Sequence, residues 1–249
     1  MGFFEKYKLK STEVNKKEAY NFALKIDQAR KTSIFDLDQV PLTPQSLLDR
    51  ANYIHEYSSP LDNKKVLFVG DNDHTSILLG YLSQSLHGTI IDIDTKVLNS
   101  INDFIVDEKF DLKTVHQDIL QILNKQQKDP IGEMLFDICV TDPPYTKKGF
   151  EMFLQYSLLH LTNNGVIYIA APYMASEDWC RNLLTHIELF LLQHHLVIEE
   201  VRQGFGIYTH FEGIISSLIV ARKFEFYKMI NKNLYTSNKD IRETLLQQS

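Results

Sequence analysis

The sequence predicts an α/β fold whose core is a mostly parallel, seven-stranded sheet. From residue 64 onward, short apolar runs alternate with segments of helical periodicity, which is the pattern of strand–helix–strand units in a parallel sheet. Runs such as VLFV at 66–69 are continuously apolar, as in strands covered on both faces. After the fifth strand, two strand-like segments follow without a helix between them, which predicts an antiparallel hairpin at one end of the sheet.

Two helices are predicted before the sheet. The first covers residues 11–26, with Ser11 or Thr12 as its cap. The second covers residues 43–57, with Thr43 as N-cap and Pro44 at the first helical position, where its missing N–H costs nothing. Residues 1–60 are therefore expected to form a helical N-terminal flank.

The elements of the sheet region follow one another in regular order. Strands are predicted at 64–70, 88–94, 112–119, 135–142 and 165–172, helices at 74–86, 95–108, 149–161 and 176–193, and the hairpin at 195–205 and 213–223. This order is typical of the Rossmann-like methyltransferase fold. We expect a Rossmann-like catalytic domain over residues 61–225 and a C-terminal helical tail over 226–249, with a helix near 237–247.

The composition is that of a soluble globular protein, at 44% hydrophobic and 23% charged residues. A net charge of −6 makes a nucleic-acid partner unlikely and suits a cationic substrate. Cys139 and Cys180 have no disulfide or zinc spacing, so no metal is expected. With no apolar run near ~18 residues and a charged N-terminus, we expect a cytoplasmic protein without membrane contact.

The residues that follow each strand are the candidates for a binding site, because such sheets bind ligands at the carboxyl ends of their strands. Asp92, 22 residues beyond Gly70, is expected to accept hydrogen bonds from ribose hydroxyls. The alternative is that it merely ends the strand while Asp94 caps the next helix. Asp118 is expected to bind an adenine amino group with Ile119 against the ring, or else to be another cap.

An acidic turn follows the first strand, where Gly70 is succeeded by Asp71 and Asp73. In methyltransferases of this fold, the carboxylate of S-adenosylmethionine lies near this turn. Two like charges at ~4 Å cost about 1 kcal/mol in water and several times more near a protein surface. The turn therefore favours decarboxylated S-adenosylmethionine, whose arm ends in an ammonium, or a polyamine. The alternative is that Asp71 caps the helix and Asp73 faces solvent.

The motif Asp142-Pro143-Pro144-Tyr145 follows the fourth strand. The two prolines fix the direction of the Asp142 carboxylate, and the Tyr145 ring offers a face to a planar or cationic group. The motif is similar to that of methyltransferases that act on exocyclic or side-chain nitrogens. We expect Asp142, Pro143 and Tyr145 to bind the amine, and the alternative is a rigid turn without chemistry.

Four segments carry a resemblance to a known family: DQVPLTPQSLLDRANYIHEY, KKVLFVGDNDHTSILLGYL, IIDID and FDICVTDPPYTKKGFEMFL. They resemble the branched-chain polyamine synthases, the N(4)-bis(aminopropyl)spermidine synthases of thermophiles and their bacterial relatives. The resemblance runs from about residue 38 to about 165, and more weakly to 222. It implies a homodimer that transfers an aminopropyl group from decarboxylated S-adenosylmethionine to a polyamine nitrogen and releases methylthioadenosine.

The family's site residues carry over by position. Gly70, Asp71 and Asp73 match its acidic turn, Asp92 its ribose-binding acid, and Asp142 the acid of its Asp-Pro-Pro loop. The sequence departs from the family pattern in three respects. Asn72 replaces the middle aspartate of the turn, Tyr145 stands where many members have glutamate, and only about 60 residues precede the first strand, where the archaeal enzymes carry a winged-helix-like domain. These departures leave open a smaller or less cationic amine than spermidine.

In the predicted reaction, a neutral amine attacks the carbon next to the sulfonium. Aliphatic amines titrate at about 10, so a carboxylate must accept the proton; Asp73 or Asp142 is predicted to do so, and Asp71 to hold an ammonium. Two alternatives remain. One is an amino-methyltransferase that uses S-adenosylmethionine on nucleic acid or another amine. The other is a non-catalytic regulator that binds a polyamine or nucleotide.

Overall fold

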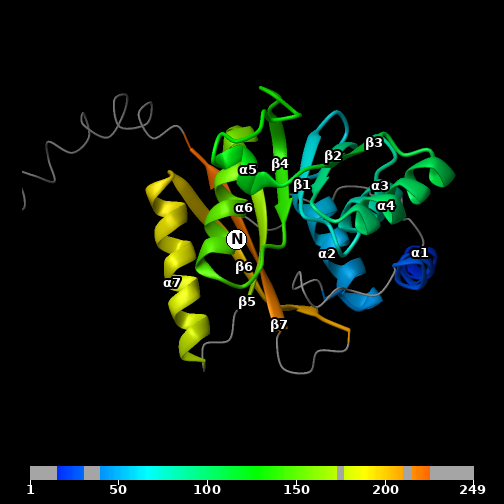
Figure 1. Cartoon of the computed structure of the whole chain (residues 1–249). Helices are drawn as coiled ribbons and strands as arrows, with labels where there is room; N and C mark the ends of the chain where they lie inside the picture. Colours follow the sequence, from blue (N-terminus) through cyan, green and yellow to red (C-terminus); the bar gives the residue numbers. More distant parts are fainter. Residues whose placement is uncertain (1–15, 31–39, 173–176, 210–214, 225–249) are drawn as a thin grey trace, which may run out of the picture.

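The computed structural model describes residues 16–30, 40–172, 177–209 and 215–224, and it contains the predicted seven-stranded sheet (Figure 1). The strand order is β3-β2-β1-β4-β5-β7-β6. The strands are β1 (Lys65–Val69), β2 (His87–Asp92), β3 (Leu112–His116), β4 (Phe136–Thr141), β5 (Leu161–Pro172), β6 (Leu196–Ile207) and β7 (Ile215–Lys223). The first five strands are parallel, and β7 is antiparallel to both β5 and β6, which confirms the predicted hairpin.

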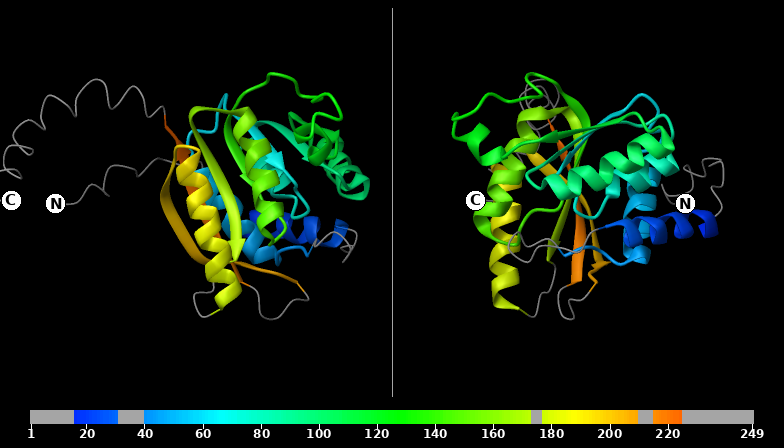
Figure 2. Two further views of the ribbon diagram at one scale, coloured as in Figure 1. Left: turned by 60° about the vertical axis from the view of Figure 1, so that its left-hand side comes forward. Right: turned by 45° about the vertical axis from the view of Figure 1, so that its right-hand side comes forward.

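The helices cover both faces of the sheet, so the fold has three layers (Figure 2). The helices are α1 (Lys16–Ala29), α2 (Pro44–Tyr57), α3 (Thr75–Leu82), α4 (Thr95–Glu108), α5 (Ile119–Leu123), α6 (Lys147–His160) and α7 (Asp178–Gln193). Alternate strand residues point to opposite faces: Val66 and Phe68 pack with α1–α4, whereas Leu67 and Val69 pack with α5–α7. This double burial explains why the strands read as unbroken apolar runs.

The start of helix α2 is bonded to the end of β6, in the hairpin formed by β6 and β7. Its N-cap is Thr43 with Pro44 at the first helical position, as predicted. The backbone N–H of Thr43 donates to Ile207 at the end of β6 over 2.8 Å, and Leu42 forms an antiparallel bridge with Tyr208. The start of α2 is therefore held against the end of β6, beside the carboxyl ends of the central strands.

Several boundaries differ from the predicted ones. Helix α3 ends at Leu82, four residues early, and α5 was not predicted because five residues are too few to show helical periodicity. The N-cap of α4 is Asp94, whose carboxylate accepts from the backbone of Lys96. The predicted caps Ser11, Thr12 and Ser176 and the tail helix near 237–247 lie outside the described residues.

Within the described ranges, no helix has the length and apolar character needed to cross a bilayer. Over the same ranges, His, Cys, Asp and Glu side chains form no group of three or more suited to a metal ion. The homodimer, the cytoplasmic location and the division into the three segments 1–60, 61–225 and 226–249 stay predictions.

Candidate functional site

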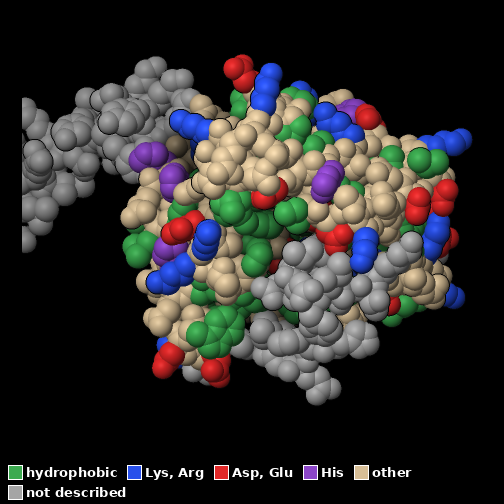
Figure 3. Space-filling view, viewed as in Figure 1, with side chains coloured by type: hydrophobic (Ala, Val, Ile, Leu, Met, Phe, Trp, Pro, Cys, Tyr) green, Lys and Arg blue, Asp and Glu red, His purple; other side chains and the backbone are tan. Residues whose placement is uncertain are grey.

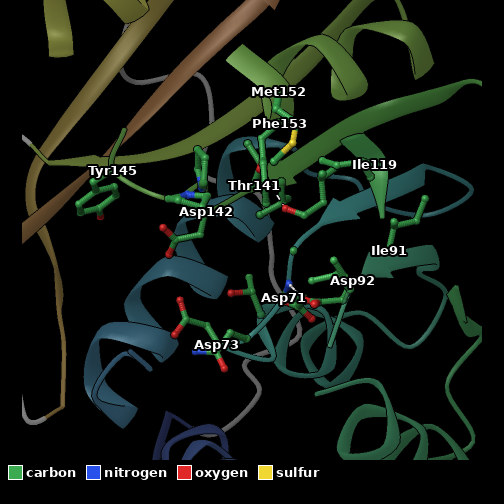
Figure 4. Close-up of a pocket in the computed structure, with 18 of the residues that line it drawn as sticks. Asp71, Asp73, Ile91, Asp92, Ile119, Thr141, Asp142, Tyr145, Met152 and Phe153 are labelled. Carbon is green, nitrogen blue, oxygen red and sulfur yellow. Dashed lines mark hydrogen bonds between the residues drawn. The ribbon is translucent and has the colours of Figure 1, made fainter. Parts of the chain in front are cut away.

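A cavity of about 580 Å³ opens at the carboxyl ends of β1–β4, where the strand order reverses (Figure 4). The chain leaves β1 towards β2 and β3 on one side and later towards β4 and β5 on the other, so loops diverge above β1 and leave space between them. The cavity brings together every residue predicted for the site: Gly70, Asp71, Asp73, Asp92, Asp118, Ile119, Asp142, Pro143 and Tyr145.

The first corner of the cavity is formed by the turn after β1 and the end of β2. Gly70 has φ +71°, a left-handed conformation that glycine adopts without strain, and its N–H donates to Ile91 over 2.8 Å. The carboxylate of Asp92 accepts from the backbone N–H of Asp71 (3.1 Å) and of Asp94 (2.8 Å). These bonds fix the Asp92 side chain at the cavity wall, and burial raises its pKa.

Asp71 stabilises the N-terminus of α3 and is almost fully buried. Its carboxylate accepts from the backbone N–H of Ser76 and, over 2.5 Å, from the Ser76 hydroxyl. Burial raises the pKa of Asp71 to about 8, even though the bonds from Ser76 lower it. Burial therefore favours the protonated form of Asp71, and a cation beside it would favour the ionised form. The alternative that Asp71 caps the helix is met in part: His74 holds the N-cap position, but the Asp71 carboxylate binds the first turn of α3 while staying on the cavity lining.

Asp73 is locked into a buried cluster of charges rather than facing solvent. Its carboxylate lies 2.8 Å from Nη1 of Arg50 and 3.7 Å from Nη1 of Arg30, and it accepts from the backbone N–H of Leu42 over 2.7 Å. Only 5% of the side chain is exposed. The same Arg50 nitrogen lies 3.0 Å from Oδ2 of Asp142, so one guanidinium joins two acids from different loops. Figure 4 shows the Asp73 and Asp142 carboxylates directed towards one another.

Asp142 is the more accessible of these two acids, with 24% of its side chain exposed. Burial raises its pKa to about 7, Arg50 lowers it, and the nearby Asp73 raises it. Burial of the Arg50 guanidinium acts to lower its pKa, but Asp142 and Asp73 outweigh this and raise it. Arg50 therefore stays charged, while the raised pKa of Asp142 moves its proton exchange towards neutral pH, as a general base requires.

The loop after Asp142 is held rigidly and places an aromatic side chain near the cavity. Thr146 caps α6 by accepting from the N–H of Gly149, and a Cβ at Gly149 would meet the Pro144 carbonyl oxygen at 2.6 Å. The hydroxyls of Tyr145 and Tyr208 are 2.6 Å apart, and burial raises the pKa of both. Two phenols on the β4 and β6 sides thus line one end of the cavity.

At the other end, Asp118 caps the short helix α5 by accepting from the N–H of Leu120 over 2.9 Å. The cap role that sequence left as the alternative is therefore observed. Asp118 and Ile119 both line the cavity together with Ile93, which is 49% exposed. This end is apolar with one acid at its edge, a surface that suits a flat nitrogenous ring.

Several lining residues were not named from the sequence, and two of them, Arg50 and Tyr208, carry polar groups next to Asp142 or Tyr145. Arg50 lies on the apolar stripe of α2 with Leu47, Ala51 and Ile54, and it is buried. A charged residue on the buried stripe of an amphipathic helix was the available signal, because such a charge requires a partner. Tyr208 was inside a glycine- and aromatic-rich segment whose position relative to the cavity no local pattern gives.

The fold and cavity define a class of protein. The strand order, with β7 antiparallel between β5 and β6, is that of a Rossmann-like, methyltransferase-type fold. A buried acidic cavity lies at the switch point of this sheet. The crystal structure of the branched-chain polyamine synthase of Thermus thermophilus, in complex with N4-aminopropylspermidine and 5'-methylthioadenosine, shares this fold. It has a TM-score of 0.72 and 21% identity, over 84% of this chain and 65% of that one. A candidate RNA methyltransferase from Pyrococcus horikoshii shares it with a TM-score of 0.62 and 14% identity, over 84% and 99%.

The chain belongs to the branched-chain polyamine synthase family, because the family described as "Branched-chain polyamine synthase A C-terminal domain" matches residues 18–248. It is 26% identical to the N(4)-bis(aminopropyl)spermidine synthase of Thermus thermophilus, over 73% of this chain and 50% of that protein. An uncharacterized protein of Methanocaldococcus jannaschii is 29% identical, over 80% of this chain and 46% of its own length. The chain therefore spans about half the length of the curated relatives it matches.

Proposed function

We propose that the chain transfers an aminopropyl group from decarboxylated S-adenosylmethionine to a nitrogen of a polyamine-type amine and releases methylthioadenosine. The observation that carries this proposal is the buried acid Asp71 next to Gly70, on the cavity wall. A donor that ends in an ammonium stabilises the ionised form of Asp71 and gains a partner there, whereas a donor that ends in a carboxylate binds only beside the protonated form or meets a like charge. Family membership supports the same reaction.

The two ends of the cavity match the two halves of this reaction. The apolar end with Ile93, Ile119 and Asp118 suits the adenine, and Asp92 suits the ribose hydroxyls. The opposite end with Asp142 and Tyr145 suits the amine. The amine nitrogen forms a bond to the propyl carbon next to sulfur, the carbon–sulfur bond breaks, and its electron pair leaves with methylthioadenosine.

Of the two acids predicted as the base, the geometry supports Asp142. Its pKa of about 7 and its partial exposure suit a group that takes a proton from the incoming ammonium form or from the attacking nitrogen. Asp73 has its carboxylate occupied by Arg50, Arg30 and a backbone N–H, so its role in the proposal is to position Arg50.

The test is mass spectrometry of the purified chain with decarboxylated S-adenosylmethionine and a panel of aliphatic amines. The expected result is a mass gain of one or more aminopropyl units and an equal yield of methylthioadenosine. Asp142→Asn is expected to lose at least about a hundredfold in turnover. Asp62→Asn, an exposed acid whose partner is Ser85, is the matched control and is expected to keep it. Absence of both products with every amine would refute the proposal.

A second candidate function is methyl transfer from S-adenosylmethionine to an amino group, favoured by the Asp142-Pro143-Pro144-Tyr145 loop. Lys and Arg side chains are scattered among acidic ones on the face shown in Figure 3, and on the described part of that face they form no continuous basic patch. A nucleic-acid substrate is therefore disfavoured on that face. A parallel incubation with S-adenosylmethionine and DNA or amines separates the two reactions by the mass added. Nucleoside and amine binding without either product would indicate the non-catalytic regulator.

A further inference from the structure

An aromatic ring on the cavity lining lies against the glycine of the turn after β1. The ring is that of Phe153, a partly buried residue of α6. A Cβ added to Gly70 would lie 2.9 Å from Cε1 of Phe153, so the ring occupies the side of Gly70 that carries no side chain. In the view of Figure 4, Phe153 lies between Asp142 and Ile119, which belong to the amine end and the adenine end of the cavity.

Gly70 itself lies between the acid proposed for the ribose and the acid proposed for the aminopropyl arm. Its N–H donates over 2.8 Å to the carbonyl oxygen of Ile91, the residue directly before Asp92. The next N–H along the chain, that of Asp71, donates to the Asp92 carboxylate over 3.1 Å. The Phe153 ring therefore lies over the part of the lining that joins Asp92 to Asp71.

The sulfur of the proposed donor belongs at this part of the cavity. It is bonded on one side to the ribose whose hydroxyls Asp92 would bind, and on the other to the propyl chain whose ammonium Asp71 would hold. The amine beside Asp142 attacks the propyl carbon bonded to the same sulfur. In the donor this sulfur is a sulfonium, which carries a full positive charge and has no hydrogen with which to form a hydrogen bond.

An aromatic face is a suitable partner for a cation of this kind, because its negative electrostatic potential attracts charge without a hydrogen bond. The other two aromatic residues on the described lining, Tyr145 and Tyr208, lie at the amine end with their hydroxyls 2.6 Å apart. Phe153 has no hydroxyl, so its ring offers a ligand only an apolar, electron-rich surface.

We propose that Phe153 is a donor-binding residue whose ring recognises the sulfonium, so that the site binds a charged sulfur in preference to a neutral thioether. The inference rests on the proposed function and adds a residue to its donor site. Transfer converts the sulfonium into the thioether of methylthioadenosine, and the attraction to the ring is lost at that step. The same contact therefore favours the binding of the donor and the release of this product.

The experiment is calorimetric titration of three ligands into the purified chain and its variants. Decarboxylated S-adenosylmethionine has the sulfonium and the aminopropyl arm. Decarboxylated S-adenosylhomocysteine has the same arm on a neutral thioether, and methylthioadenosine has the thioether without the arm. Phe153→Leu keeps an apolar side chain and removes the ring. Its Kd for the sulfonium donor should rise about tenfold, whereas its Kd for each thioether should change by less than about threefold.

The matched control is Phe190→Leu, the same substitution at a buried phenylalanine of α7 outside the cavity. It should leave the affinities for all three ligands unchanged. An equal loss for all three ligands in Phe153→Leu would show that the ring only packs against the nucleoside, and this would overturn the inference. An unchanged donor affinity would overturn it as well.

Replacement of Phe153 by monofluorinated and by trifluorinated phenylalanine gives a second readout for a case in which Phe153→Leu does not fold. Fluorine keeps the shape of the ring and weakens the negative potential of its face. The donor affinity should fall stepwise with fluorination while the thioether affinities stay constant, and a constant donor affinity would refute the inference. Failure of the wild type to bind the donor would overturn both proposals, whereas donor binding without transfer counts against the proposed function alone.

Discussion

Replacing Asp73 and Asp142 separately with asparagine should separate a structural acid from a reactive one. Both carboxylates bind the same Arg50 nitrogen, at 2.8 and 3.0 Å. Their surroundings differ, because Asp73 has 5% of its side chain exposed and Asp142 has 24%. We expect Asp73→Asn to lower stability strongly and Asp142→Asn to lower activity strongly with little effect on stability.

The magnitudes follow from burial and protonation. Removing one partner of a buried ion pair costs about 3–5 kcal/mol. In Asp73→Asn, Arg50 keeps only the more exposed Asp142 and Arg30 keeps Asp27, so we expect a loss at the lower end of this range, about 3 kcal/mol. At about 2–4 °C per kcal/mol for a chain of this size, the melting temperature should fall by roughly 6–12 °C. Burial raises the pKa of Asp142 and thus favours its neutral form, so a neutral asparagine, whose amide oxygen can still accept from Arg50, should cost about 1 kcal/mol or less.

The assay is urea unfolding followed by circular dichroism, together with the melting temperature. The matched control is Asp27→Asn, which removes a more exposed partner of Arg30 with 35% of its side chain accessible and should cost about 0–1 kcal/mol. The reasoning would be refuted if Asp73→Asn unfolded within about 1 kcal/mol of the wild type while Asp142→Asn lost about 3 kcal/mol or more.

Three further predictions concern Asp71 and Gly70 on the cavity lining and the Asp129–His160 pair outside it. The pKa of Asp71 is about 8 in the folded chain against 3.8 in the unfolded chain, so the folded chain binds this proton more tightly. Asp71 therefore lowers the free energy of unfolding as the pH rises from about 4 to about 8. Asp71→Asn should remove that contribution and flatten the decline, and an unchanged slope in urea titrations across this range would contradict it. Gly70→Ala should lower the free energy of unfolding by about 1–2 kcal/mol because of its positive φ, and further because its Cβ would lie 2.9 Å from the ring of Phe153. The control is Gly132→Ala, with φ +59° and no atom within 4 Å, which should show the backbone cost alone in the same unfolding assay. Asp129→Ala removes the acceptor 2.8 Å from Nε2 of the buried His160 and should cost about 2–3 kcal/mol by thermal unfolding, and a melting temperature equal to the wild type would show that the bond is not needed.

Much of the fold could be predicted from sequence because its determinants are local. The unbroken apolar run at 66–69 requires a strand covered on both faces, and the Thr43-Pro44 pair specifies where α2 begins. The carboxyl ends of parallel strands meet at one edge, so the order of strands alone predicts that Asp92, Asp118 and Asp142 gather in one place. Short elements such as α5 could not be predicted, since five residues carry no period.

The candidate site was predicted in composition but not in its internal pairing. Sequence placed Asp71, Asp73 and Asp142 together and treated Asp73 and Asp142 as equivalent candidates for the base. The structure distinguishes them through Arg50, which lies 23 residues before Asp73 and 92 before Asp142 in the chain. A buried arginine on a helical stripe indicates that a partner exists, but its identity depends on which loops the fold brings alongside.

The sequence by itself determined the order of strands and helices, the edge of the sheet where acidic side chains lie together, and the family whose motifs these acids match. It did so because periodicity, capping and strand-end chemistry act over a few residues. Only the tertiary structure decided which acids are free to react, because burial and ion pairing are set by contacts between distant segments. The bridge from Leu42 to Tyr208 holds α2 at the cavity, and with it the guanidinium of Arg50 that neutralises two of the acids.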